Sequence, residues 1–468
     1  MMRSLFSGVS GLKSHQTRMD VIGNNIANVN TTGFKSSRTT FADTLSQTLT
    51  GASSPSGTLG GTNPKQVGLG TGVASIDTIF TDGSVQSTGK NTDLCLSGNG
   101  LFVVKQGNQT YYTRDGAFEF DEEGNYVLPG TGLYVQGWMG TDGSINTSAA
   151  ATNINIPAGK SMASEASEIS SYSNNLDAST SLIKSITYTD ANGQSQTATG
   201  RITVDGTNIK SAVITLTDGT TQTVTSGSYM PNHSMPVTTT ITAYDSLGTA
   251  HNIPVMFEKT TSNEWTAILS NGTNTQNITE TDGSTTTVTL TPGSLVFTEA
   301  GSIDSANMSN GALTLTFGNG ASTANITLDY SSLTQYAGNS TINAATDGHA
   351  AGTLSSVSVD SSGIITGTYT NGVKQAEAQV AVAQFTNASG LTKTGNSLYE
   401  ESNNSGTANV KTATDLGVTI TPSALEMSNV DVADQFSDMI ITQRGYQSNS
   451  KIITVGDEML ETVINMKR

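Results

Sequence analysis

The two ends of the chain share one pattern that the residues between them lack. Near the amino terminus, apolar residues recur every three or four positions at Leu5, Val9, Leu12, Met19, Ile22, Ile26 and Val29. Near the carboxyl terminus the same spacing returns at Leu425, Val432, Phe436, Met439, Ile440, Ile453, Leu460, Val463 and Met466. This spacing is typical of α-helices with one apolar stripe. The sequence therefore predicts a helix at each end, free to pair with the other and with neighbouring copies of the chain.

The middle of the chain is rich in threonine, serine, glycine and asparagine, with short apolar runs of strand length. Dipeptides that favour hairpin turns separate the runs, among them Asp82-Gly83, Asp115-Gly116, Gly124-Asn125 and Asp142-Gly143. We therefore expect a mainly β, multidomain protein. An α-helical coiled-coil domain made by the paired terminal helices would be joined to two or three nested β-sandwich or barrel-like domains.

At 468 residues the chain is too long for a single core. Apolar runs are stronger on either side of the central stretch than within it, which suggests that the two flanking segments pair into one domain. The expected division is a helical domain of 1–30 with 427–468, an extended connector at 31–72, an inner β-domain of 73–145 with 352–426, and an outer β-domain at 146–351, in which 182–230 is a candidate extra β subdomain. Residues 51–72 are expected to be an adjustable, weakly ordered linker because they are mostly glycine, serine, threonine and proline.

Charged residues make up only 13 % of the chain, and the net charge is -17. This balance argues against a nucleic-acid or anionic-membrane partner. No stretch approaches the roughly 20 apolar residues of a membrane-spanning helix, and the amino terminus lacks the apolar core of a cleavable signal peptide. The single cysteine, Cys95, excludes an internal disulfide and is expected in a buried strand.

No motif in the sequence indicates catalysis. The four histidines lie far apart and outside any metal-binding spacing. The glycine-rich segment 68–72 lacks the lysine and hydroxyl residue of a phosphate-binding loop. We therefore expect no catalytic, cofactor-binding or metal-binding residues and no enzyme activity.

Motifs at both ends resemble the signatures of the bacterial flagellar rod and hook protein family. The amino-terminal motifs are Ser4-Leu5-Phe6-Ser7-Gly8-Val9-Ser10-Gly11-Leu12 and Ile22-Gly23-Asn24-Asn25-Ile26-Ala27-Asn28-Val29-Asn30-Thr31-Thr32-Gly33-Phe34-Lys35. The carboxy-terminal motifs are Leu425-Glu426-Met427-Ser428-Asn429-Val430-Asp431 and Met439-Ile440-Ile441-Thr442-Gln443-Arg444-Gly445-Tyr446-Gln447-Ser448-Asn449. In the middle, 242–251 and 360–372 resemble the outer domain of the hook branch of this family.

The resemblance implies a structural subunit that self-assembles into a curved helical tube, the universal joint that transmits torque from motor and rod to filament. It also implies export by the flagellar type III apparatus without a cleaved signal peptide, and an extracellular location in the hook at the basal body. The implied partners are further copies of the chain and the distal rod, hook cap and hook–filament junction proteins.

The terminal stripes give the expected assembly interface. We expect Leu5, Val9, Leu12, Ile22 and Ile26 to face Phe436, Ile440, Ile453 and Leu460 and the same helices of adjacent subunits. The full set of expected interface residues is Leu5, Phe6, Val9, Leu12, Met19, Ile22, Asn25, Ile26, Phe436, Met439, Ile440, Tyr446, Ile453, Leu460 and Val463. Two alternatives remain at this point, the distal rod protein of the same family and a secreted β-rich adhesin that forms discrete oligomers.

Overall fold

The computed structural model describes residues 2–466 except 56, 58–59, 190–192, 199–201, 205–211, 225–226 and 281–282. The chain divides into two compact units. The first comprises Met1–Lys160, Leu354–Thr368 and Lys374–Arg468, and the second comprises Ser161–Thr353 and Tyr369–Val373. The described chain is mainly β, with several β-domains and two terminal helices that pack together, which confirms the expected fold class.

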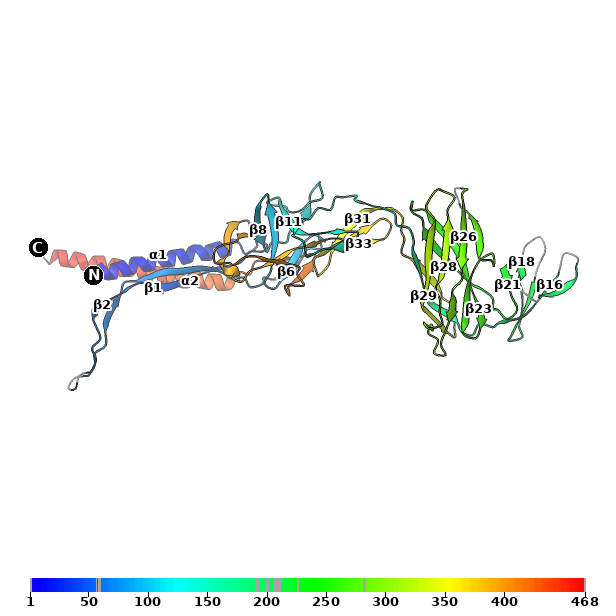
Figure 1. Ribbon diagram of the computed structural model, residues 1–468. Coiled ribbons are helices and arrows are strands. Elements are labelled where there is room, and N and C mark those ends of the chain that lie inside the picture. Colours follow the sequence, from blue (N-terminus) through cyan, green and yellow to red (C-terminus); the bar gives the residue numbers. More distant parts are fainter. Residues whose placement is uncertain are drawn as a thin grey trace. The chain divides into compact units, whose positions relative to one another are not determined.

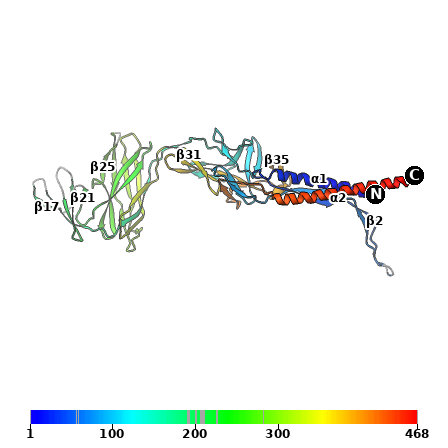
Figure 2. The same cartoon turned by 180° about the vertical axis from the view of Figure 1, so that it is seen from behind.

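The terminal helices are α1 (Met2–Ala27) and α2 (Val432–Asn465), and they lie side by side in the first unit (Figures 1 and 2). The expected helical domain began at residue 427, five residues before α2. Residues 427–430 are instead non-helical and run alongside segments 34–36 and 79–84 through hydrogen bonds. Asp431 then caps α2, accepting hydrogen bonds from the backbone N–H groups of Ala433 and Asp434 at 2.8 and 3.3 Å.

Two antiparallel ribbons follow α1. Strand β1 (Ser37–Asp43) pairs with β4 (Thr71–Thr78), and β2 (Ser46–Thr50) pairs with β3 (Lys65–Gly68). The β1/β4 ribbon packs along α1, and the β2/β3 ribbon extends beyond it (Figure 1). The segment expected as an extended connector, 31–72, is therefore extended and partly paired in its described residues.

The inner β-domain is built around β11 (Leu133–Thr141), which joins strands from distant parts of the sequence. Val135 pairs with Val104 of β7 (Leu101–Gln106), and Gly137 pairs with Val380 of β33 (Lys374–Val380). These ladders support the expected pairing of 73–145 with 352–426. The other elements are β5 (Val85–Ser87), β6 (Leu94–Ser97), β8 (Gln109–Thr113), β9 (Glu119–Phe120), β10 (Tyr126–Leu128), β12 (Ser144–Ile145), β13 (Thr152–Asn153), β31 (Gly352–Val359), β32 (Ile364–Tyr369), β34 (Val382–Gln384), η1 (Ala388–Gly390), β35 (Thr392–Gly395), β36 (Leu398–Glu400), β37 (Asn409–Lys411), β38 (Thr419–Pro422) and β39 (Ala424–Glu426).

Residues 146–160 differ from expectation because they belong to the first unit rather than to the outer domain. Strand β13 pairs with β11 through Gln136 and Asn153. Ile154 and Ile156 are buried in the core that contains Phe102, Val104 and Val380. Burial of these two side chains ties the segment to the inner β-domain.

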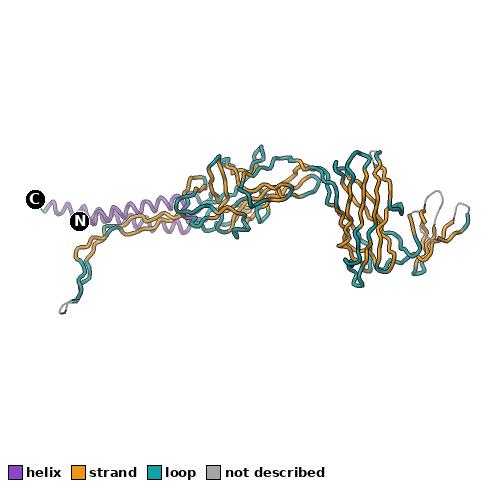
Figure 3. Tube along the Cα trace, in the orientation of Figure 1, coloured by secondary structure: helices purple, strands orange, loops and turns teal. Residues whose placement is uncertain are grey.

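The second unit contains two sheets that face each other over one core (Figure 3). One sheet has the order β22-β23-β24-β27, and the other has the order β25-β26-β28-β29-β15-β30. Both contribute to a core that includes Phe257, Trp265, Leu313 and Tyr330. The strands are β14 (Ser161–Met162), β15 (Ile169–Asp177), β22 (Val237–Tyr244), β23 (Ala250–Thr261), β24 (Glu264–Leu269), β25 (Thr275–Thr279), β26 (Thr285–Thr291), β27 (Ser294–Val296), β28 (Gly311–Thr316), β29 (Ala324–Tyr336) and β30 (Asn343–Thr346).

Segment 182–230 forms separate small sheets in its described residues. The strands are β16 (Ile183–Thr189), β17 (Ser195–Ala198), β18 (Ile202–Val204), β19 (Ala212–Leu216), β20 (Thr221–Val224) and β21 (Gly227–Tyr229). Ile183, Ile186, Ile214 and Tyr229 form a core of their own. This separate core supports the expected extra β subdomain.

Candidate assembly site on the terminal helices

Helices α1 and α2 are antiparallel. Leu5 of α1 lies beside Gly456 near the far end of α2, whereas Asn25 donates to the Gln435 side chain near its start at 2.9 Å. Between these points Arg18 forms an ion pair with Asp438 at 2.9 Å. The two helices therefore contact each other over most of the length of α1.

Small residues allow the helices to approach closely. A Cβ atom added to Gly11 would lie 2.8 Å from Asn449 Nδ2, and one added to Gly445 would lie 2.7 Å from the His15 ring. Real Cβ atoms do not come so near other heavy atoms, so a larger residue at either position would have to displace the Asn449 or His15 side chain or widen the helix separation. The seam is made of glycine, asparagine, histidine and an ion pair as much as of apolar side chains.

This seam differs from the apolar contact expected between the stripes. Leu5 and Ile453 lie in the seam against glycines of the opposite helix. Phe436 and Ile440 instead are exposed, as are Phe6 and Val9 of α1. The period of the apolar residues gave the correct helices, but the glycines place part of the stripe outside the pair.

The structure places the expected interface residues in three groups. Ile22 and Asn25 are buried, and Asn25 joins α1 to β1 by exchanging hydrogen bonds with the Ser37 backbone at 2.8 and 3.0 Å. The half-buried residues are Leu5, Leu12, Met19, Ile26, Met439, Ile453 and Leu460. The exposed residues are Phe6, Val9, Phe436, Ile440, Tyr446 and Val463.

The exposed group is larger than the sequence indicated. Phe6 is 65 % exposed and Ile440 is 58 % exposed. Further exposed apolar residues are Val432, Ile441, Ile452, Val455, Met459 and Ile464 on α2 and Met466 directly after it. So many large apolar side chains left in water are typical of an interaction surface.

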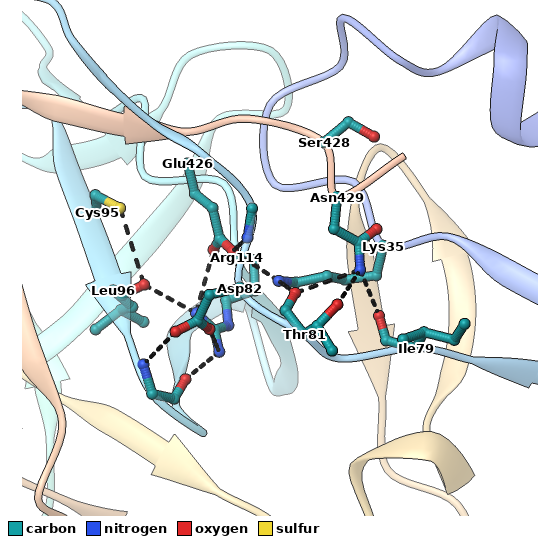
Figure 4. A network of polar contacts seen from close by, with 12 residues as sticks. Lys35, Ile79, Thr81, Asp82, Cys95, Leu96, Arg114, Glu426, Ser428 and Asn429 are labelled. Atoms are coloured by element: carbon teal, nitrogen blue, oxygen red, sulfur yellow. Dashed lines mark hydrogen bonds and ion pairs between the residues drawn. The ribbon is translucent and has the colours of Figure 1, made fainter. Parts of the chain in front are cut away.

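A buried ion cluster lies where both helices meet the inner β-domain (Figure 4). Glu426 accepts from Lys35 Nζ at 2.6 Å and from Arg114 Nη1 at 3.1 Å, and each of the three side chains is 1 % exposed. Burial, together with the nearby Arg114 charge, lowers the pKa of Lys35, while Glu426 opposes that shift. This cluster was not expected from the sequence, although Lys35 and Glu426 each lie within a terminal motif.

Two further side chains with reactive or titratable groups, Cys95 and His251, are buried. Cys95 is buried in β6, as expected, and burial raises the pKa of its thiol to about 11. His251 is also buried, and its two ring nitrogens lie 2.8 Å from Glu280 and 3.2 Å from Asp245.

Among the described residues, no group of three or more histidine, cysteine or acidic side chains could hold a metal ion. In the same part of the chain, no helix has the length and apolar character needed to cross a membrane.

Four protein families match successive parts of the chain. They are the Flagella basal body rod protein at 5–35, the Flagellar hook protein FlgE/F/G D1 domain at 95–170, the Flagellar basal body protein FlaE D2 domain at 230–349 and the Flagellar basal body rod FlgEFG protein C-terminal at 421–466. These matches define the class as an axial protein of the bacterial flagellum, of the rod and hook type.

Relatives that match over their whole length show which type of axial protein the chain resembles. The flagellar hook protein FlgE of Treponema pallidum is 40 % identical over 490 residues, covering 100 % of both chains. The corresponding protein of Borreliella burgdorferi is 37 % identical over 486 residues, again covering 100 % of both chains. A crystal structure of Helicobacter pylori flagellar hook protein FlgE2 matches with a TM-score of 0.42 and 15 % identity, covering 73 % of this chain and 100 % of that chain.

The chain therefore belongs to the family of bacterial flagellar hook proteins. The resemblance inferred from the terminal motifs is confirmed. Members of this family are structural proteins rather than enzymes, and they polymerise with other flagellar components in the hook. The distal rod and adhesin alternatives are not favoured by these matches.

Proposed function

We propose that this chain assembles into the curved tube of the hook through the exposed apolar faces of α1 and α2. The observation that carries the proposal is the exposure of Phe6, Val9, Phe436 and Ile440 in a helix pair that already has a close seam. These side chains are left for helices of adjacent subunits. Burial of each large apolar side chain in such a contact would contribute about 1.5 to 3 kcal/mol.

The contact is expected to be heterologous, with different faces of α1 and α2 meeting in adjacent subunits. Such a contact grows into an open helix when its rotation does not close a ring. The half-buried group of interface residues, such as Leu5 and Ile453, then holds the pair within one subunit. The exposed group joins pairs in different subunits.

The β-domains are proposed to form the outer layers of the tube, around an inner layer of helices. The β2/β3 ribbon is exposed, and Leu49 of β2, Leu45 just before it and Val67 of β3 leave apolar surface in water. A two-stranded ribbon of this kind is marginally stable alone. Segment 51–72, which includes β3, remains our proposed adjustable connector, because unbacked ribbons can shift at little cost as the tube bends.

Family membership supports a proposal for the location and partners of this chain. We propose export through the flagellar type III apparatus without a cleaved signal peptide, and an extracellular position in the hook at the basal body. The proposed partners at the ends of the tube are the distal rod, hook cap and hook–filament junction proteins. No catalytic step is part of this function.

The test is polymerisation of the purified full-length chain, followed by sedimentation and electron microscopy. We expect curved tubes from the wild-type chain and a critical concentration raised about ten-fold or more by Ile440→Ala, because the lost burial of about 1.4 kcal/mol or more corresponds to that factor. The monomer should keep its unfolding temperature, because Ile440 is exposed there. Gln443→Ala, at an exposed polar position of α2, is the matched control and should polymerise as the wild type does.

Discrete oligomers from the wild-type chain would contradict the proposal and favour an adhesin. Straight tubes would favour a rod. Unchanged polymerisation of Ile440→Ala together with Phe436→Ala would remove α2 from the proposed interface.

A further inference from the structure

The ion cluster of Lys35, Arg114 and Glu426, here called the root cluster, brings together three separate parts of the first unit. Lys35 lies eight residues after the end of α1, Glu426 lies in β39 shortly before α2, and Arg114 follows β8 of the inner β-domain. Figure 4 shows their charged groups converging. One carboxylate therefore contacts cations from both the amino-terminal segment and the β-domain.

Backbone contacts around the root cluster tie the same segments together. The Gly33 N–H donates to the Glu426 carbonyl at 2.8 Å, and the Gly83 N–H donates to Glu426 Oε1 at 2.8 Å. The Ser36 N–H donates to the Asn429 side chain at 2.7 Å. The segments that lead out of α1 and into α2 are thus bonded to each other and to the strand region at 79–84.

The root cluster leaves little room for another arrangement. Lys35 Nζ also donates to the Thr81 carbonyl at 2.6 Å, and Arg114 donates to the carbonyls of Leu96 and Gly98. Gly33 has a positive φ of 64°, and a Cβ atom there would lie 2.5 Å from the Asp115 nitrogen. Charge-assisted hydrogen bonds depend on direction, so this set of partners is satisfied in one relative placement of the three segments.

Buried ion pairs add little stability compared with apolar side chains of similar volume, but they can specify one geometry. An apolar contact at the same place would tolerate sliding or rotation of the segments. The position of the root cluster, at the point where both helices leave the β-domain, makes geometry the property that it controls.

We propose that Lys35, Arg114 and Glu426 are positioning residues that fix the direction in which α1 and α2 leave the inner β-domain. The joint between the helix layer and the β-domain is then rigid, and torque passes through it without slack. This inference rests on the proposed function, because direction matters only when many subunits share one tube.

The experiment compares full-length variants in monomers and in assembled tubes. The variants are Glu426→Gln, which removes the buried carboxylate shared by Lys35 and Arg114 but leaves Arg114 its ion pair with Asp82 at 3.4 Å, and the triple change Lys35→Met, Arg114→Met and Glu426→Met, which replaces the root cluster with apolar side chains. Glu119→Gln is the matched control, since Glu119 forms an exposed pair with Lys90 in the same domain. The readouts are unfolding temperature, amide hydrogen exchange and the helical repeat of tubes in electron micrographs.

Glu426→Gln should raise exchange of the Gly33, Ser36 and Gly83 amides on the order of a hundred-fold, with no change at β7. The triple variant should keep an unfolding temperature close to that of the wild type, but its tubes should have an altered or irregular repeat or should not form. This combination distinguishes a role in setting the direction of the helices from a role in stabilising the fold. Apolar side chains could fully replace a cluster whose only role was to stabilise the fold.

Wild-type repeat and curvature in the triple variant would overturn the inference. If the triple variant does not fold, Glu426→Gln decides the matter: exchange unchanged at the three amides, or raised equally throughout the domain, overturns it, whereas a local rise with irregular tubes supports it. Failure of the wild-type chain to form tubes would count against the proposed function instead.

Discussion

The helix pair and the sandwich of the second unit, here called the outer unit, bury apolar surface in opposite ways. In the sandwich, two sheets enclose a core in which Phe257, Trp265 and Tyr330 are fully buried. In the helix pair, glycines and polar side chains form the seam, while Phe436 and Ile440 stay exposed. The sandwich encloses most of its large apolar side chains within one chain, whereas the helix pair leaves part of its apolar surface exposed.

This difference teaches how one chain can be both a folded subunit and part of a polymer. A closed core has a unique, cooperative structure without partners. A helix pair with an open apolar face gains stability when other copies cover it. Changes in the sandwich should therefore affect folding more than assembly, and changes on the helices should affect assembly more than folding.

The largest expected effect comes from opening the closed core. Trp265→Ala should lower the free energy of unfolding of the outer unit by about 3 to 5 kcal/mol, because it removes a fully buried ring. It also removes the indole N–H that donates to the Gln335 side chain at 3.1 Å. Differential scanning calorimetry of the full-length chain measures this change as a lower temperature of the unfolding transition.

Tubes should still form from Trp265→Ala below that transition, because the helices are unchanged. The control is Leu247→Ala, a change at an exposed apolar residue of the same unit. It should alter the free energy of unfolding by no more than about 0.5 kcal/mol. Loss of tube formation while the outer unit remains folded would contradict the division between folding and assembly.

A smaller effect is expected from crowding the helix seam. Gly11→Leu should push α1 and α2 apart at a cost of about 1 to 3 kcal/mol, because its Cβ atom would overlap Asn449. Gly23→Leu is a matched control in the same helix, since a Cβ atom there has no described neighbour within 4 Å. Helix propensity alone favours leucine over glycine at both positions.

Circular dichroism during thermal unfolding should separate the two glycine variants. We expect lower helical stability for Gly11→Leu and equal or higher stability for Gly23→Leu, and weaker polymerisation for Gly11→Leu. Equal behaviour of the two variants would show that the close approach at Gly11 is not important.

Much of the fold was predictable because its signals are local and periodic. Apolar residues spaced three or four positions apart predicted α1 and α2, and dipeptides that favour hairpin turns predicted the strand boundaries. The pairing of distant segments, such as Val135 with Val104 and Gly137 with Val380, was suggested by apolar density alone. Register and sheet order depend on long-range contacts, which no local pattern contains.

The candidate site was predictable in outline but not in detail. The spacing of apolar residues identifies an apolar stripe, but it does not show which part of the stripe faces the partner helix. In the structure, glycines such as Gly11 and Gly445 lie at the close contacts between the helices. The root cluster was missed because Lys35, Arg114 and Glu426 are far apart in sequence, and a lone charged residue usually lies at the surface. The available signal was that Lys35 and Glu426 lie within the terminal motifs, where few other residues are charged.

The smallest expected effect is a pH dependence of the helix seam. His15 lies against Gly445, and its Nδ1 is buried without a hydrogen-bond partner among the described residues. Burial and the nearby Arg18 charge lower the pKa of His15 below its ordinary value of 6.5. The unfolded chain therefore binds a proton more readily than the folded pair, so seam stability should be full above pH 6.5 and decrease as the pH falls toward the lowered pKa. Thermal unfolding of the helical signal between about pH 8 and about pH 5 measures this change. His15→Gln should reduce the dependence, whereas His349→Gln in the outer unit should leave it unchanged, and a helical stability that rises on acidification would contradict the assignment to His15.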